Sequence, residues 1–222
     1  MIRQTPELEI VVATRNAGKV REIQTALFHL PISLLSLDDF QNISSIDEVG
    51  ETYQENALLK ALGYARQTGA CALADDSGLE VDALNGRPGV FSARFAGPDA
   101  SDTKRNEKLL AALSGYDTAD RSARFVCSMA LAGWAPGTRS IENEPQLLKV
   151  TEGRCEGTIA AGPKGDHGFG FDPLFVPNGY DATFGELPDE MKSRISHRAL
   201  ALAQMREFLE RWLFGRSISN PT

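Results

Sequence analysis

Short apolar runs alternate along this chain with segments in which apolar residues recur every three or four positions. The run at residues 9–13 (EIVVA) is typical of a buried strand. The apolar positions that follow it have the spacing of an amphipathic helix: Val20, Ile23, Leu27 and Leu30. Neither element buries its apolar side alone, so such a chain must pair its strands in a sheet and cover that sheet with helices. The alternation therefore predicts an α/β fold.

The same alternation continues towards the C-terminus. Thr52 and Glu55 form a capping box that opens a second helix, and Gly69 ends it. Further strands are expected at residues 70–74, 124–132 and 147–152, and further helices at residues 101–113 and 196–214. A loop containing Gly and Pro separates the last two strands, which favours an antiparallel pair and hence a mixed sheet. We predict one domain, residues 1–222.

Charge and composition narrow the classes of partner. The 222 residues include 23 Lys and Arg against 30 Asp and Glu, and broad nucleic-acid binding needs a cationic surface that such a chain lacks. No stretch approaches the ~18 consecutive apolar residues of a membrane span. The first residues lack the apolar core of a signal peptide, and three scattered cysteines do not make a disulfide framework. We therefore expect a cytoplasmic protein with no nucleic acid or membrane partner, whose anionic ligands are held by local clusters of positive charge.

The loop after the first strand is a candidate anion site. Its residues are Thr14, Arg15, Asn16, Ala17, Gly18 and Lys19. Backbone N–H groups at the start of the following helix favour anions, and Lys19 adds a full positive charge. A Walker A loop would have Gly and a hydroxyl residue where this chain has Ala13 and Val20. Any metal ion must therefore be held elsewhere. A plain strand–helix turn with a surface lysine is the alternative.

Two adjacent aspartates follow the strand predicted at residues 70–74. Successive strand residues point to opposite sides, so we expect only one of Asp75 and Asp76 to face a given site. Carboxylate oxygens suit Mg²⁺, which takes one or two carboxylates and keeps several waters. A second acidic group, Asp47 and Glu48 with Glu51 nearby, precedes the second helix and could complete the metal shell. The alternatives are a turn capped by Asp75 and ordinary acidic residues at a helix start.

Residues 162–173 are rich in glycine and phenylalanine. Glycines let the backbone approach a ligand closely, and Phe169 and Phe171 offer flat faces to a base. The alternative is a glycine-rich hairpin whose phenylalanines belong to the core.

Four side chains capable of positive charge lie within residues 192–198, where the last helix begins. If Ser196 is the N-cap, His197 and Arg198 occupy the first turn, where the helix dipole disfavours cations by about 0.3–1 kcal/mol. This departure from local rules indicates an anionic or acceptor-rich partner. The alternative is a solvated basic stretch paired with the acidic residues 189–190.

Taken in order, these pieces resemble the inosine/xanthosine triphosphate pyrophosphatase family, which acts on noncanonical purine nucleoside triphosphates. Five segments carry the resemblance: residues 13–19 (ATRNAGK), 74–79 (ADDSGL), 88–95 (PGVFSARF), 168–173 (GFGFDP) and 192–198 (KSRISHR). They span nearly the whole chain. Arg15 departs from the family pattern, in which a small residue is common.

The resemblance implies an Mg²⁺-dependent hydrolase that splits ITP, dITP or XTP into the nucleoside monophosphate and pyrophosphate, and so keeps deaminated purines out of DNA and RNA. It implies a two-lobed α/β fold with a long mixed sheet flanked by helices, an active-site groove between the lobes, and a homodimer. Asp76 would be the catalytic base and a metal ligand, with Glu48 as second ligand. The loop at residues 14–19 would hold the triphosphate, and Ser77 would touch the substrate. The nucleoside pocket would be formed by Phe169, Gly170, Phe171, Asp172, Lys192, His197 and Arg198.

Selection of the base would rest on its 6 position, where hypoxanthine and xanthine carry an acceptor and adenine a donor. A pocket of donors leaves the adenine amino group unpaired, which allows ~10⁴-fold rejection of ATP. Two other functions stay open: a pyrophosphatase acting on modified pyrimidines or methylated nucleotides, and a nucleotide-binding regulator without turnover. The adjacent Asp75 and Asp76 argue against the regulator, because a sensor of phosphates gains nothing from carboxylates beside them.

Overall fold

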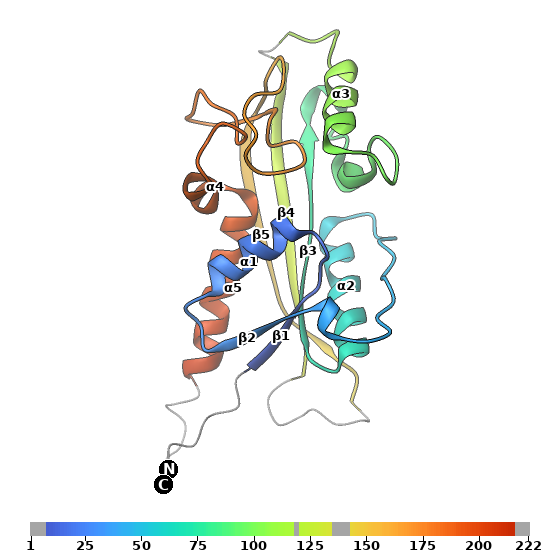
Figure 1. The fold of residues 1–222 in the computed structure, drawn as a ribbon, viewed down its shortest axis with the longest axis vertical. Helices are drawn as coiled ribbons and strands as arrows, with labels where there is room; N and C mark the ends of the chain where they lie inside the picture. The colour runs from blue at the N-terminus through green and yellow to red at the C-terminus, as the bar shows by residue number, and fades with distance from the viewer. Residues whose placement is uncertain (1–7, 118–119, 135–142, 216–222) are drawn as a thin grey trace. The chain divides into compact units, whose positions relative to one another are not determined.

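The computed structural model describes residues 8–117, 120–134 and 143–215, and its strands form a six-stranded sheet in the order β2-β1-β3-β4-β5-β6 (Figure 1). The strands are β1 (Leu8–Val12), β2 (Ile32–Ser36), β3 (Cys71–Val81), β4 (Ser122–Gly133), β5 (Gln146–Ile159) and β6 (Phe175–Pro177). Strand β1 pairs in parallel with β2 and β3, whereas β5 and β6 are antiparallel. The α/β class with a mixed sheet, predicted from the alternation of elements, is confirmed.

The described chain divides into two compact units. Unit 1 contains residues 8–76, 128–134, 143–151 and 201–215, and unit 2 contains residues 77–117, 120–127 and 152–200. Strands β3, β4 and β5 each contribute residues to both units. The assignment of residues 1–222 to one domain stays a prediction.

In unit 1, the core between α2 and the sheet is rich in small side chains. Helix α2 (Tyr53–Thr68) begins at the predicted capping box and ends at Gly69, whose φ of 66° is the left-handed conformation that glycine adopts readily. Alanines of α2 pack with alanines of β3 and β4 in one core cluster: Ala57, Ala61, Ala65, Ala72, Ala74, Ala130 and Ala132. Helices α1 (Ala17–Leu27) and α5 (His197–Phe214, in unit 1 from Ala201) lie on the other face of β1 and β3 (Figure 1). Small side chains bring α2 close to the sheet, so polar groups on its inner side reach β3.

Unit 2 has an aromatic core instead. The rings of Phe125 and Phe175 lie 4.7 Å apart, and Phe184 stacks on Phe175 at 5.4 Å. Helices α3 (Asp102–Ala112) and α4 (Asp189–Ile195) belong to this unit. Leu109 of α3 is buried in the same cluster. The loops that carry the glycine-rich segment are thus attached to a core of large side chains.

Several element boundaries differ from those predicted. The strand expected at residues 70–74 continues to Val81, so the two aspartates lie within β3 and not in a turn after it. The strand expected at residues 147–152 continues to Ile159. Both extensions contain Gly and charged residues, which lower strand propensity, and pairing with neighbouring strands outweighs that local preference. Helix α4 was not predicted at all, because its seven residues are too few to show a helical period.

Candidate functional site

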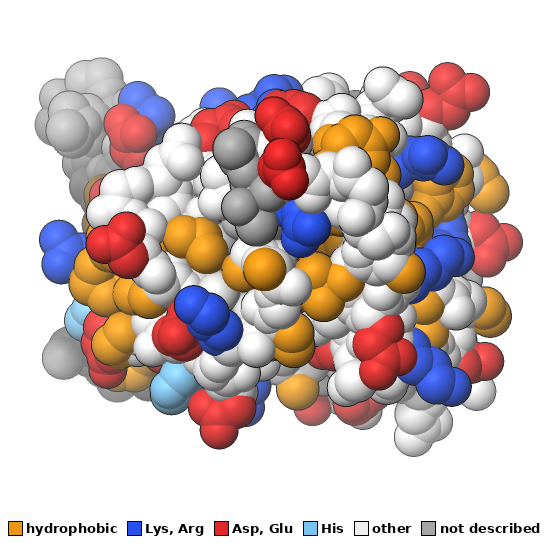
Figure 2. Space-filling model, turned by 90° about the horizontal axis from the view of Figure 1, so that it is seen from above, with side chains coloured by type: hydrophobic (Ala, Val, Ile, Leu, Met, Phe, Trp, Pro, Cys, Tyr) orange, Lys and Arg blue, Asp and Glu red, His pale blue; other side chains and the backbone are white. Residues whose placement is uncertain are grey.

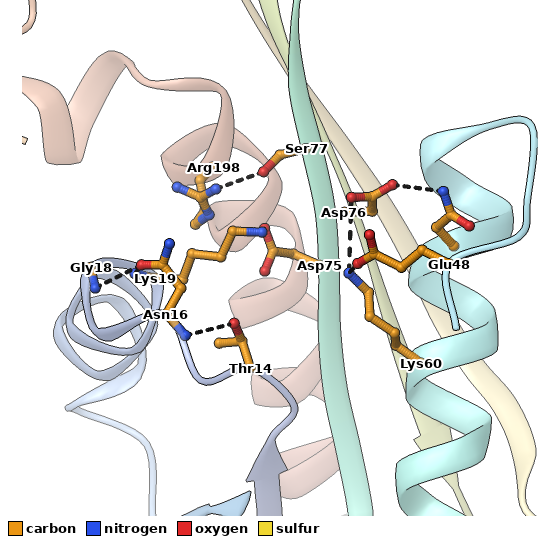
Figure 3. A network of polar contacts seen from close by, with 11 residues as sticks. Thr14, Asn16, Gly18, Lys19, Glu48, Lys60, Asp75, Asp76, Ser77 and Arg198 are labelled. Carbon is orange, nitrogen blue, oxygen red and sulfur yellow. Dashed lines mark hydrogen bonds and ion pairs between the residues drawn. The ribbon is translucent and has the colours of Figure 1, made fainter. Parts of the chain in front are cut away.

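The loop between β1 and α1 is organised by Asn16. Its side-chain oxygen accepts hydrogen bonds from the N–H groups of Gly18 and Lys19 at 2.9 and 3.2 Å. The hydroxyl oxygen of Thr14 accepts from the Asn16 N–H at 3.2 Å (Figure 3). The loop was expected to offer its N–H groups to an anion, but Asn16 already uses these two. The positive groups that the loop offers are the side chains of Lys19 and Arg15.

The Lys19 side chain is held by Asp75. Its Nζ lies 2.8 Å from Asp75 Oδ2 (Figure 3). The Asp75 side chain is fully buried, and the Lys19 side chain is 16% exposed. Arg15 lies apart from this pair, with a side chain that is 57% exposed and 3.8 Å from the exposed Asp38. The loop thus presents one positioned cation, and Arg15 is a surface residue.

Asp76 points to the other side of β3, towards α2, which confirms that the two aspartates face opposite ways (Figure 3). Asn56 donates from Nδ2 to Asp76 Oδ2 at 3.0 Å. Lys60 lies 2.5 Å from Glu48 Oε1 and 3.9 Å from Asp76 Oδ1. Glu48 and Asp76, predicted as partners from separate parts of the sequence, therefore share one ammonium group.

Burial raises the pKa of Asp76 above its usual value, and the negative charge of Glu48 raises it further. Lys60, Lys19 and the hydrogen bond from Asn56 act in the opposite direction without outweighing these effects. The raised pKa means that the ionised form of Asp76 is less stable here than in water. A carboxylate in that state binds a proton or a cation readily.

Lys60 keeps its charge despite being buried. Burial lowers the pKa of its ammonium, but Asp75, Asp76 and Glu48 together raise it by more, so the net shift is upwards. Asp75 acts on Lys60 only through its charge, from the other side of β3, and is itself paired with Lys19, so Lys60 contacts two carboxylates, Glu48 and Asp76. The cluster has an excess of negative charge.

This excess bears on metal binding. Among the described residues, no group of three or more His, Cys, Asp or Glu side chains is arranged to hold a metal ion. Mg²⁺ does not need one, because it commonly takes one or two carboxylates and completes its shell with water and substrate oxygens. Glu48 and Asp76 lie close enough together to contact the same cation, Lys60. These two carboxylates are therefore a fitting pair of Mg²⁺ ligands.

Asn56 and Lys60 were missed by sequence reasoning. Both are buried on the inner side of α2, four residues apart, among residues such as Ala57 and Ala61. Asn56 also accepts from the Gly50 N–H at 2.8 Å, which ties the loop before α2 to Asp76. Polar residues at helical spacing on an otherwise apolar side of a predicted helix were the available signal.

A second cluster lies in unit 2 around Phe169. Asp172 Oδ2 accepts from the Phe169 N–H at 2.7 Å and from Lys192 Nζ at 2.7 Å. Lys192 Nζ lies 4.5 Å from the centre of the Phe169 ring, and the guanidinium carbon of Arg198 lies 5.6 Å from it. Two cations thus contact one aromatic ring. The predicted grouping of Phe169, Asp172, Lys192 and Arg198 is found in the structure.

His197 and Arg198 open α5, as predicted, and the Ser196 hydroxyl accepts from the Ala199 N–H at 3.1 Å. Arg198 is only 2% exposed and donates from Nη2 to Ser77 Oγ at 2.8 Å (Figure 3). The His197 ring stacks on Phe125 with 4.6 Å between ring centres. These contacts offset the unfavourable placement of two cation-capable groups at a helix start.

Two of the predicted positions have other surroundings. Phe171 is buried in the core cluster of unit 2, so Phe169 alone offers an aromatic face from this segment. Lys192 lies in the last turn of α4, where the helix dipole favours a cation. We had grouped Lys192 with the cation-capable residues at the start of the last helix, because the sequence shows no clear break between α4 and α5.

The surface of the molecule carries charges of both signs. On the face seen in Figure 2, basic and acidic side chains are interspersed, with apolar side chains between them. None of the three cysteines takes part in a disulfide bond, and all three are buried. In the described part of the chain, no helix is long and apolar enough to cross a membrane.

Comparisons with known proteins extend over almost all of the chain. Residues 10–208 match the model of the Ham1 family. A relative from Syntrophobacter fumaroxidans named "dITP/XTP pyrophosphatase" is 50% identical, over 94% of this chain and 86% of its own. One of the same name from Geobacter sulfurreducens is 47% identical, over 90% of this chain and 96% of its own. The solved structure of a HAM1 protein from Coxiella burnetii is 44% identical with a TM-score of 0.80, covering 92% of this chain and 99% of that one.

Proposed function

This chain belongs to the Ham1 family, and we propose that it hydrolyses dITP, XTP and ITP to the nucleoside monophosphate and pyrophosphate. The names of the relatives from Syntrophobacter fumaroxidans and Geobacter sulfurreducens support dITP and XTP as substrates. One observation carries the proposal: Glu48 and Asp76 share the buried ammonium of Lys60, in a cluster with more negative than positive charge. Such a cluster suits a cation-assisted reaction at phosphate.

We assign the catalytic base to Asp76. A general base works best when its pKa lies near the working pH, and burial moves the pKa of Asp76 in that direction. Asn56 holds one carboxylate oxygen by a 3.0 Å hydrogen bond, which orients the group towards an attacking water. Mg²⁺ bound by Glu48 and Asp76 would neutralise charge on the triphosphate and lower the pKa of the water.

Lys19 is assigned to the phosphates. Phosphoryl transfer asks mainly for charge neutralisation and positioning from the protein, and little covalent chemistry. Lys19 is held at 2.8 Å by Asp75, and Asn16 and Thr14 hold the loop that carries it. A lysine positioned in this way neutralises an anion without first having to be ordered.

The base is assigned to the cluster in unit 2. Phe169 offers a face for stacking, and Lys192, His197 and Arg198 supply donors for the 6-oxo group. Against ATP, the adenine amino group would meet donors and stay unpaired. An unpaired polar contact of this kind permits rejection of ATP by ~10⁴-fold.

A nucleotide panel tests the proposal. Pyrophosphate release is measured from ITP, dITP, XTP, ATP, dTTP and UTP, with Mg²⁺ and with EDTA. We expect multiple turnover on the first three nucleotides with Mg²⁺, and loss of activity with EDTA. A preference for dTTP or UTP contradicts the assignment of substrate. Stoichiometric binding without product contradicts the assignment as an enzyme.

The homodimer is also part of the proposal and is supported by the family resemblance. Light scattering coupled to gel filtration measures the mass directly. We expect twice the mass of one chain, and a mass equal to one chain at micromolar concentration contradicts this part.

A further inference from the structure

Gly170, the residue after Phe169, is held at both of its backbone polar groups by side chains of α3. Its N–H donates to Asp102 Oδ2 at 2.7 Å, and its carbonyl oxygen accepts from Asn106 Nδ2 at 3.2 Å. Asp102 and Asn106 are four residues apart and therefore lie on the same side of the helix. They are 68 and 64 residues away from Gly170 in the sequence.

The backbone on the other side of the Phe169 ring is held as well. Asp172 Oδ2 accepts from the Phe169 N–H at 2.7 Å, and the same oxygen contacts Lys192. Gly168 and Gly170 both have positive φ, 75° and 65°. A segment with glycines on both sides of its aromatic residue loses much conformational freedom when it is ordered. Side chains outside the segment supply the hydrogen bonds that hold it.

Asp102 is itself held in position. Its Oδ1 pairs with Arg105, whose Nη1 donates to the carbonyl oxygens of Ala100 and Ala93 at 2.5 and 3.0 Å. Both oxygens of the Asp102 carboxylate therefore have a partner, Oδ1 with Arg105 and Oδ2 with the Gly170 N–H. An ionised acceptor also makes the stronger type of hydrogen bond.

Asn106 is arranged in a way that stability does not explain. The residue is 6% exposed, and among the described residues its Oδ1 has no hydrogen-bond partner. A buried amide that is only half satisfied costs free energy that an apolar side chain of similar size would not. Its side-chain nitrogen donates to the backbone beside Phe169, at the carbonyl oxygen of Gly170. Breaks of a local rule of this kind are expected where a residue serves function.

We propose that Asp102 and Asn106 are positioning residues for the nucleobase pocket, acting through Gly170 to fix the Phe169 ring against Lys192 and Arg198. This inference rests on the function proposed above, in which Phe169 stacks on the base. Without the two side chains, the ring leaves its place over the cations for part of the time. Binding of the base must then also order the segment around Phe169, and the free energy of that ordering weakens binding.

The test compares Asp102→Ala and Asn106→Leu with the wild type. Steady-state kinetics with ITP and Mg²⁺ give kcat and KM, and calorimetric titration with inosine monophosphate gives the Kd of the base without a triphosphate. We expect KM and Kd to rise about tenfold, because one hydrogen bond to an ordered segment is lost in each variant. We expect kcat to change by less than about twofold, since the lost interaction serves ground state and transition state alike.

Two further variants separate positioning from stability. Asp102→Asn keeps an acceptor for the Gly170 N–H, and we expect it to restore KM and Kd to within about threefold of wild type. Glu107→Ala changes an exposed carboxylate of the same helix and serves as the matched control, with unchanged KM and Kd. The thermal unfolding midpoint of Asn106→Leu is expected to match or exceed that of the wild type, which a residue needed only for folding would not allow.

Unchanged KM and Kd in both Asp102→Ala and Asn106→Leu overturn the positioning role, and so does a fall in kcat with KM unchanged. The Asp102 side chain is 42% exposed, so alanine leaves no large cavity, and Asn106→Leu decides the question if Asp102→Ala does not fold. A wild-type protein that neither binds inosine monophosphate nor hydrolyses ITP overturns the proposed function itself. This outcome is seen in the wild-type protein, whereas the outcomes that overturn the positioning role are seen only in the variants.

Discussion

Unit 1 and unit 2 each bury one lysine, and the two lysines have opposite surroundings. Lys60 is 8% exposed and Lys192 is 5% exposed. Lys60 is shared by two carboxylates, Glu48 and Asp76, and its single charge does not balance them. Lys192 is paired with Asp172 at 2.7 Å and lies over an aromatic ring.

The difference assigns each lysine a different task. An excess of buried negative charge is costly unless another cation joins it, so the surroundings of Lys60 favour binding of a metal ion. A lysine that is matched by one carboxylate and stacked on a ring has no such excess, so Lys192 presents an ordered donor. Burial alone therefore does not indicate the role of a lysine. The number of carboxylates that contact it is the better guide.

The largest effect is expected at the carboxylate that Lys60 shares. Asp76→Asn keeps the shape of the side chain and its hydrogen bond from Asn56 but removes the base, so kcat for ITP should fall by roughly a hundredfold or more. The free energy of unfolding should not fall, because burial already disfavours the ionised form. Steady-state kinetics and urea denaturation measure the two quantities. Asp38→Asn, at an exposed aspartate of the same unit, is the control, and a near-normal kcat in Asp76→Asn removes Asp76 from the mechanism.

The next effect tests the charge excess directly. Lys60→Met leaves Glu48 and Asp76 facing each other without the ammonium, so the free energy of unfolding in EDTA should fall by about 3 kcal/mol. Mg²⁺ should raise the free energy of unfolding of the variant by a large part of this loss, and should raise that of the wild type by less. Urea denaturation with and without Mg²⁺ measures both. Lys104→Met, at an exposed lysine of α3, is the control, and equal Mg²⁺ effects in Lys60→Met and wild type contradict the idea that the cluster lacks a cation.

A smaller effect is expected in unit 2. Phe169→Ala removes the ring under Lys192 and Arg198, and KM for ITP should rise about tenfold, the size of one lost base–aromatic stack. Phe169→Tyr keeps the ring and should lie near wild type. Phe91→Ala, at a phenylalanine of the same unit that is mostly exposed, is the control. Steady-state kinetics with ITP measure kcat and KM for these variants. A loss of kcat without a change in KM would show that Phe169 serves the chemical step and not substrate binding.

The smallest effect is expected at Arg15. Within the described chain it forms an ion pair with Asp38 at 3.8 Å, and both side chains are mostly exposed. Exposed ion pairs contribute about 0–1 kcal/mol, so Arg15→Ala should change KM for ITP by less than about twofold and leave unfolding nearly unchanged. A KM that rises tenfold would show that Arg15 takes part in phosphate binding after all.

Local signals account for the parts of the fold that were predicted correctly. The capping box at Thr52 located the start of α2, and Ser196 located the start of α5, because both depend on residues within one helical turn. The alternating direction of Asp75 and Asp76 followed from strand geometry alone. The end of β3 was predicted wrongly, because residues 75–81 have little strand propensity by themselves. They are extended because neighbouring strands pair with them.

In the candidate site, too, some residues were predicted from the sequence and others were found only in the structure. Glu48, Asp76, Phe169, Lys192 and Arg198 were proposed from residue types and motifs, which are visible in one dimension. Asn56 and Lys60 were not proposed, and neither were Asp102 and Asn106. Each of these four acts on a residue at least 12 positions away, and nothing local marks that relation.

The amino-acid sequence alone determined the α/β class, the family and the residue types of the chemistry, because hydrophobic period, caps and motifs are properties of neighbouring residues. Tertiary structure decided which charges meet: that Lys19 is held by Asp75, that Lys60 is shared by Glu48 and Asp76, and that Phe171 belongs to the core while Phe169 does not. The physical reason is that burial and Coulomb energies depend on distance in space, and residues far apart along the chain reach those distances only when it folds.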